Sequence, residues 1–332
     1  MRPRWIVSLC IVLAVGSVVS VIARASVKAL AASAINKPAN AKKWTVPRTA
    51  WGDPDLTGVY SNDDQAGIPL ERPRELGDRK IEEITPEELA EVNRQRVARL
   101  NAQLAGFGST LFVGSLERKN NREWLVVDPP DGRVPPLTSE AQERQARRRI
   151  VNRDEGPFEG YEDLGLYERC ITRGIPNSMM SVLYGGNYEI IQSRGQVAIR
   201  YEMIHEARII PLDRRPRVGK KLRLDLGDAR GRWEGEALVV ETTNFASRSA
   251  FRGATEDLQL TERFTPTDQG HLEWKVTVND SRTWTRPWSF TMTLTRKDES
   301  QRIYEYACHE GNYGLQNILT AARSADQARQ EK

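Results

Sequence analysis

Histidine and cysteine are scarce in this 332-residue chain, which contains three of each. The G-x-S-x-G elbow, the P-loop, the C-x-x-C pair and the Rossmann glycine pattern are all absent, which excludes the enzyme classes built on them. His205-Glu206 and His309-Glu310 each begin like H-E-x-x-H, but Ile209 and Tyr313 stand where the second histidine is needed. The zincin class is therefore excluded, and we expect neither a metal ion nor a cofactor.

A strong excess of charge of one sign is also lacking. The formal net charge is +4, and without residues 1–25 the chain has 46 basic against 45 acidic residues, a net charge of +1. No basic field remains that would attract a nucleic acid. Charged residues make up 28% and hydrophobic residues 39%, which is typical of a globular protein rather than a disordered one.

The N-terminal segment carries the sequence pattern of an export signal. Arg2 and Arg4 precede an apolar run from Trp5 to Ile22, and Ala23-Arg24-Ala25 follows as an A-x-A cleavage site. We expect residues 1–25 to be a cleaved signal peptide and the protein to be periplasmic or secreted. The run is long enough for an uncleaved membrane anchor, which is the alternative and the only membrane contact expected.

The rest of the chain divides by composition into a tether and one domain. Residues 26–48 are rich in Ala, Lys, Asn and Pro and are expected to form a flexible tether, followed by a single β-rich domain over 49–332. Within it, a helical region is predicted over 80–155. One helix should begin at Thr85-Pro86 and run to about Leu104, and a second should begin at Thr138-Ser139.

From Met179 onward the sequence predicts strand after strand. Gly186–Arg217 reads as a hairpin with a turn at Ser193-Arg194-Gly195, and the other predicted strands are Ala237–Thr243, Leu258–Phe264, Leu272–Val278, Trp288–Thr295 and Ile303–Cys308. Asn317–Arg329 has helical character and is expected to close one side. The predicted fold class is mainly β with flanking helices (α+β), an antiparallel meander that closes into a calycin-like barrel.

Alternation along these strands gives the candidate catalytic residues. Val197, Ile199, Tyr201 and Met203 share one face, and His205 is next on that face. Glu262 and Asp280 fall on or just after the apolar faces of their strands, and His309 follows the last predicted strand. A carboxylate beside His205 would form a base and its orienting partner. The alternative for Glu262 is a buried ion pair with an arginine, for which the candidates are Arg200, Arg208, Arg252 and Arg263.

Three functions remain open at this point. The first is a binding protein that holds a small, largely apolar molecule, with Tyr201, Met203, Trp274, Glu241 and Arg263 as expected contacts. The second is a hydrolase, isomerase or lyase on the same barrel, with His205 as general base and Glu262 or Asp280 as its partner. The third is an envelope protein-interaction module. The sequence does not predict the oligomeric state.

Two cysteines remain once Cys10 leaves with the signal segment. Cys170 precedes the strand-rich half and Cys308 ends the last predicted strand. An exported protein can join such a pair, so we expect a disulfide that ties the two ends of the barrel. Two separate buried thiols are the alternative.

Several stretches resemble known families. Gly58-Val59-Tyr60 and Gly231-Arg232-Trp233 resemble the G-x-W motif that opens lipocalin and calycin barrels. The chain also resembles a large family of exported bacterial proteins of unassigned function, through Trp51–Leu56, Arg232–Gly235 with Leu238–Phe245, Trp284–Trp288 and Tyr304–Gly314. The resemblance implies export and a β-rich fold, and it implies no particular chemistry.

Overall fold

The computed structural model describes residues 44–79, 81–105, 123–148, 158, 160–181, 185–298 and 300–330. The chain divides into two compact units, Met1–Trp44 and Thr45–Lys332, and the second is described below. The expected signal peptide and most of the expected tether, residues 26–48, therefore lie outside the described residues.

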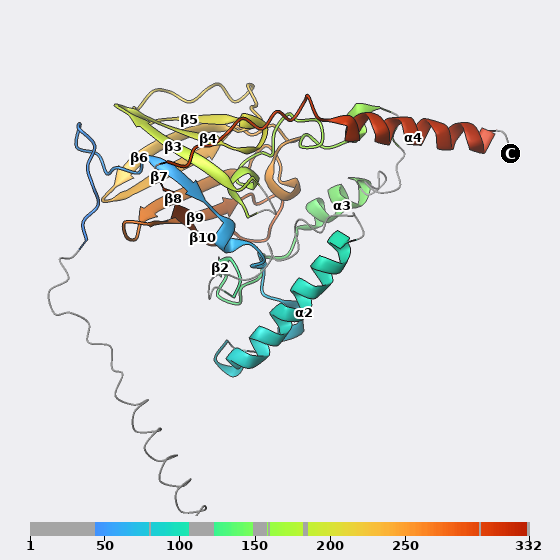
Figure 1. Cartoon of the computed structure of the whole chain (residues 1–332), viewed down its shortest axis with the longest axis horizontal. Helices are drawn as coiled ribbons and strands as arrows, with labels where there is room; N and C mark the ends of the chain where they lie inside the picture. The colour runs from blue at the N-terminus through green and yellow to red at the C-terminus, as the bar shows by residue number, and fades with distance from the viewer. Residues whose placement is uncertain are drawn as a thin grey trace, which may run out of the picture. The chain divides into compact units, whose positions relative to one another are not determined.

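The second unit is built around an antiparallel sheet of ten strands made from two meanders. The first meander consists of β3 (Asn187–Ser193), β4 (Gln196–Tyr201) and β5 (Ala207–Pro211). The second consists of β6 (Asp228–Glu234), β7 (Ala237–Thr243), β8 (Gln259–Pro266), β9 (His271–Asn279) and β10 (Trp288–Arg296). Each strand pairs with the one before it in its meander (Figure 1).

Two short strands from the N-terminal half complete the sheet. β1 (Gly58–Ser61) lies between β3 and β10 and joins the two meanders, which gives the order β5-β4-β3-β1-β10-β9-β8-β7-β6. β2 (Val126–Asp128) pairs with the first residues of β10, on the edge of β10 that β1 uses further along.

The two ends of this order, β5 and β6, approach each other without forming a ladder of hydrogen bonds. Gly231 of β6 faces β5 so closely that a Cβ there would lie 2.8 Å from Ile210 Cγ2 and 2.6 Å from Leu212 Cδ2. A side chain at position 231 would push the two strands apart, so a glycine allows the approach. The sheet is thus a nearly closed barrel, and the predicted fold class is confirmed. We call the contact between β5 and β6 the seam.

Alternation fills the inside of the barrel. In β8 and β9, every second residue is almost completely buried, namely Leu260, Glu262 and Phe264, then Leu272, Trp274, Val276 and Val278. The Trp274 ring meets Phe290 of β10 edge to face at 5.6 Å and stacks on Phe264 at 6.3 Å. These aromatic contacts make the inside a packed core rather than an open channel.

Three α-helices among the described residues accompany the sheet. α2 (Pro86–Ala105) begins as predicted, with the Thr85 hydroxyl accepting the Glu88 N–H at 3.2 Å and proline in the first turn. α3 (Ser139–Arg148) is capped by the Thr138 hydroxyl, which accepts the Ala141 N–H at 3.1 Å. α4 (Tyr313–Gln330) ends the described chain. Short 3₁₀ helices lie at Asp63–Gln65, Arg74–Leu76, Ile81–Glu83, Tyr161–Asp163, Asn177–Met179, Met203–His205 and Phe251–Gly253. No helix among the described residues is long and apolar enough to span a membrane.

Two predictions about the C-terminal segment are wrong. Ile303–Cys308 is irregular chain and not a strand, although Ile303 is buried. β10 already has β9 on one edge and β1 with β2 on the other, so a strand that follows it has no free edge of β10 to join. α4 has no buried residue and therefore does not close the barrel.

Candidate functional site

A charged pair lies inside the barrel. Glu262 of β8 is fully buried, and Arg208 of β5 donates to its two oxygens, from Nη1 to Oε2 at 2.6 Å and from Nη2 to Oε1 at 3.1 Å. Trp274 Nε1 donates to Oε1 at 3.2 Å. Burial lowers the pKa of Arg208, but the Glu262 carboxylate and Tyr201 together raise that pKa by more, so the guanidinium stays charged.

A row of three tyrosines crosses the inner wall beside this pair. Tyr60 of β1, Tyr188 of β3 and Tyr201 of β4 stand opposite one another in the strand register, and all three are buried. Burial raises the pKa of each phenol, so each stays protonated and can donate a hydrogen bond. We call this set the tyrosine row.

Two donors of the tyrosine row have no acceptor in the part of the chain that the structure describes. Tyr60 donates to the Leu56 carbonyl at 3.0 Å, whereas the hydroxyls of Tyr188 and Tyr201 have no partner among the described residues. Two more inward polar atoms, Arg208 Nε and Thr242 Oγ1, are also buried without a hydrogen-bond partner among the described residues. A buried polar atom without a partner costs about 1–3 kcal/mol, so the inside of the barrel holds unused hydrogen-bonding capacity.

The structure brings some predicted contact residues together and separates others. Tyr201, Met203 and Trp274 are buried, and Tyr201 and Trp274 belong to the inner wall. Glu241 and Arg263 lie on the outer face, where Glu241 pairs with Arg232 at 2.6 Å and Arg263 pairs with Glu234 at 2.7 Å. In β7, Leu238, Val240 and Thr242 face inward, which turns Glu241 outward.

The two carboxylates predicted to be catalytic, Glu262 and Asp280, already accept hydrogen bonds from other residues. Asp280 lies in the turn after β9, where its Oδ2 accepts from the Thr255 amide at 2.6 Å and the Thr283 hydroxyl at 2.7 Å. Its Oδ1 accepts the Arg282 amide at 3.0 Å. Glu262 is held by Arg208, the arrangement considered above as the alternative to catalysis. The two carboxylates therefore have separate sets of partners.

His309 is not buried together with these carboxylates. His309 is exposed, in the turn after the disulfide. The face that was expected to carry His205 ends early, because β4 stops at Tyr201 and Ile204 adopts a left-handed φ of 62° within the 3₁₀ turn Met203–His205. The side chain of His205 lies outside the described part of the chain, so its role stays a prediction. No group of three or more His, Cys, Asp or Glu suited to a metal ion occurs among the described residues.

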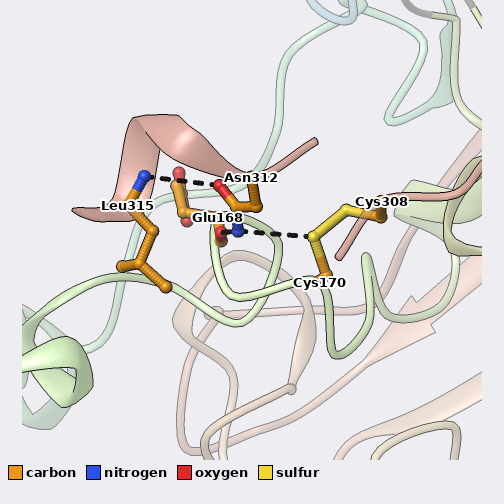
Figure 2. The surroundings of a disulfide bond; sticks show 5 residues. All are labelled: Glu168, Cys170, Cys308, Asn312 and Leu315. Atoms are coloured by element: carbon orange, nitrogen blue, oxygen red, sulfur yellow. Dashed lines mark hydrogen bonds between the residues drawn. A yellow bond between two sulfur atoms is a disulfide. The ribbon is translucent and has the colours of Figure 1, made fainter. Parts of the chain in front are cut away.

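Cys170 and Cys308 form the predicted disulfide, with their Cα atoms 5.8 Å apart. Figure 2 shows that Asn312 reinforces this link, since its Nδ2 donates to the Glu168 carbonyl at 2.8 Å and lies 3.5 Å from Cys170 Sγ. The Leu315 amide donates to Asn312 Oδ1 at 3.3 Å at the start of α4. The disulfide thus attaches the C-terminal segment to the loop that contains Cys170.

Two hollows open on the surface of the described part. One, of about 490 Å³, lies between the loop 165–174 and the turn 246–250. The other, of about 540 Å³, lies beside the Asp280 turn and is lined in part by Arg217, Lys220, Arg223 and Arg282.

Comparison with known proteins identifies no family. No family model matches the chain, and no curated protein matches it. Two solved structures show a limited likeness. One is an abundant heat-soluble protein (SAHS) from Ramazzottius varieornatus, with 10% identity, a TM-score of 0.24 and coverage of 40% of this chain and 87% of that one. The other is a point mutant of the fluorescent protein UnaG, with 15% identity, a TM-score of 0.22 and coverage of 40% and 86%. The resemblance to exported bacterial proteins therefore stays a prediction.

Sequence reasoning missed the tyrosine row. Tyr188 and Ile190 alternate in the same way as Ile199 and Tyr201, which signals that both tyrosines face inward. That the two tyrosines stand opposite each other, with Tyr60 beyond them, follows from the strand register, which the sequence does not state.

Proposed function

We propose that this protein is exported and binds a small, largely apolar molecule inside its barrel, with an oxygen acceptor of that molecule facing Tyr188 and Tyr201. The observation that carries the proposal is the pair of fully buried phenol donors without an acceptor among the described residues, set in a wall of apolar side chains. Pockets for small molecules combine an apolar lining with a few polar groups that fix orientation.

The chemistry of the inner wall suggests the class of ligand. Both phenols stay protonated and Arg208 stays charged, so the polar atoms without a partner in the described part of the barrel are mainly donors. A carbonyl or carboxylate oxygen accepts from such groups, while Ile199, Phe264 and Phe290 suit an apolar body. The ligand would accept hydrogen bonds from the Tyr188 and Tyr201 hydroxyls, which have no other acceptor among the described residues.

Binding is favoured over catalysis by the state of the two buried carboxylates. A general base must reach the proton that it removes, but both oxygens of Glu262 and both oxygens of Asp280 already accept hydrogen bonds.

The seam supplies a route for the ligand. Every other neighbouring pair in the strand order is joined by ladder hydrogen bonds, whereas β5 and β6 meet through side-chain contacts at Gly231. Strands held in this way can separate without breaking a ladder. The inner side chains are closely packed and leave no open channel into the barrel. The ligand would therefore have to enter where β5 and β6 move apart.

Export is supported by the disulfide, which is typical of proteins that fold outside the reducing cytosol. The intact mass of the protein from the envelope fraction of its own host should place the mature N-terminus at Ser26. The full-length mass at the membrane would favour the anchor instead.

The binding proposal is tested on the same material by native mass spectrometry. We expect a retained small molecule that is released on unfolding and can be identified. Tyr201→Phe removes one donor and should weaken rebinding of that molecule by about fivefold or more, since one hydrogen bond is worth about 1 kcal/mol or more. The same change should leave the unliganded protein at least as stable as before, because the buried hydroxyl has no partner among the described residues and its removal takes away an unpaired polar atom.

Tyr304→Phe is the matched control, because Tyr304 is 82% exposed. It should change neither binding nor stability. A protein that carries no small molecule, or a Tyr201→Phe variant that binds as tightly as the unmodified protein, would overturn the proposal.

A further inference from the structure

The hollow of about 490 Å³ beside the disulfide lies outside the barrel interior. One wall is the loop 165–174, and the other is the turn 246–250. The walls meet at Gly174, where a Cβ would lie 3.0 Å from the Ser249 carbonyl oxygen. A volume of this size is within the range of roughly 300–1,000 Å³ that is usual for small-molecule sites.

We propose that this hollow is a second binding site, for a neutral, hydroxyl-rich molecule such as a short saccharide, and that it depends on the Cys170–Cys308 disulfide. The proposal concerns a site separate from the tyrosine row and does not rest on the function proposed above.

The charges at the hollow are already balanced. Arg248 is held by both oxygens of Asp225, at 2.9 and 2.7 Å. The guanidinium of Arg173 lies over the Tyr167 ring at 5.3 Å, and Glu168 supplies a further negative charge. Counted with Asp225, which pairs with Arg248 but does not line the hollow, these two arginines and two acids sum to a formal charge of zero. A charged ligand would have to displace an existing partner, whereas a neutral one would not.

The uncharged polar side chains that line the hollow are suited to bind the hydroxyl groups of a ligand. Asn177 and Ser181 line the hollow, are half-buried, and have no side-chain partner among the described residues. An amide and a hydroxyl can each donate and accept, which is the capacity that a ligand hydroxyl also has. Tyr167 and Met180 add apolar surface for the carbon face of a sugar ring.

The disulfide holds one wall in place. Cys170 lies in the middle of the loop 165–174, and its bond to Cys308 and the bond from Asn312 to the Glu168 carbonyl fix that loop to the C-terminal segment (Figure 2). Thr172, in the same loop, donates to Glu206 at 2.8 Å. Opening the disulfide removes the covalent part of this attachment, so we expect the hollow to lose its shape.

The test uses NMR titration of the mature protein with maltose and with N,N′-diacetylchitobiose, and with glucose 6-phosphate as the charged comparison. We expect at least one neutral disaccharide to shift the signals of Asn177 and Ser181, and the charged sugar to bind more weakly. Asn177→Ala should weaken binding by about fivefold or more, as for the loss of one hydrogen bond. Gln95→Ala, on the exposed side of α2, is the control and should bind normally.

The dependence on the disulfide is tested with Cys170→Ser combined with Cys308→Ser. This variant should keep the circular dichroism of the β-sheet and lose saccharide binding. The absence of binding by both neutral disaccharides, or unchanged binding by Asn177→Ala, would overturn the site. Binding by the double serine variant equal to that of the oxidised protein would overturn the role of the disulfide.

Discussion

Arg208 and Glu262 form an ion pair inside the barrel, with Nη1 and Oε2 2.6 Å apart and with side-chain exposures of 3% and 0%. They come from β5 and β8, so the pair spans the interior near the seam. Its two charges also act on the buried phenol of Tyr201. The pair and the tyrosine row therefore form one connected polar region in an otherwise apolar core.

Removal of one partner should destabilise the protein strongly. Arg208→Met leaves the Glu262 carboxylate buried and uncompensated, which should lower the free energy of unfolding by about 3–5 kcal/mol. Adding Glu262→Gln removes that charge and keeps an acceptor for Trp274 Nε1, so the double variant should recover more than half of the loss. Urea unfolding measures both.

The exposed pair Arg263–Glu234 is the control for this prediction. Arg263→Met should lower the free energy of unfolding by about 0–1 kcal/mol, as is usual for surface ion pairs. If the double variant at positions 208 and 262 were no more stable than Arg208→Met alone, an uncompensated charge would not be the cause of the loss.

Asp280 should prove to be a structural residue. Its carboxylate accepts bonds from Thr255, Arg282 and Thr283 in one turn, and bonds to a charged group are each worth about 1.5–3 kcal/mol. Asp280→Ala should therefore lower the free energy of unfolding by about 2–4 kcal/mol. Asp257→Ala, at an exposed acid in the same region, should have little effect. An Asp280→Ala variant of unchanged stability would contradict this role.

Glu206 should make stability depend on pH. Burial raises the pKa of Glu206, the nearby charge of Asp225 adds to this, and the hydrogen bond from Thr172 opposes it. Because the folded pKa is above the unfolded one, the folded protein binds a proton first and gains stability as the pH falls through the raised pKa. At neutral pH the charged form is a net cost.

Glu206→Gln should therefore raise the melting temperature at neutral pH and lose this advantage as the pH approaches the ordinary pKa of glutamate, about 4.3. Differential scanning calorimetry across this range measures the difference. Glu143→Gln, at an exposed site on α3, should show no such trend. A Glu206→Gln advantage that grows on acidification would contradict the sign of the effect.

The sequence predicted the C-terminal meander well because alternation there is regular. Glu262 could be placed on the inner face from Leu260 and Phe264 alone, and Arg208 was among its possible partners. The sequence did not indicate which arginine pairs with Glu262, because β5 and β8 are brought together by closure of the barrel. The bend after Tyr201 could not be predicted from the sequence either. It depends on a left-handed conformation of Ile204, which is usual for glycine or asparagine and not for isoleucine.

The position of β1 has a consequence for how the chain assembles during synthesis. β1 is made early, yet it first meets a partner at residues 187–190 of β3 and then at residues 295–296 of β10. Until β10 emerges, the growing chain holds two half-sheets with open edges and nothing to unite them. Such edges invite pairing with other chains, and contacts between distant segments form slowly. We therefore expect the incomplete chain to be prone to pairing with other chains until its last strand is complete.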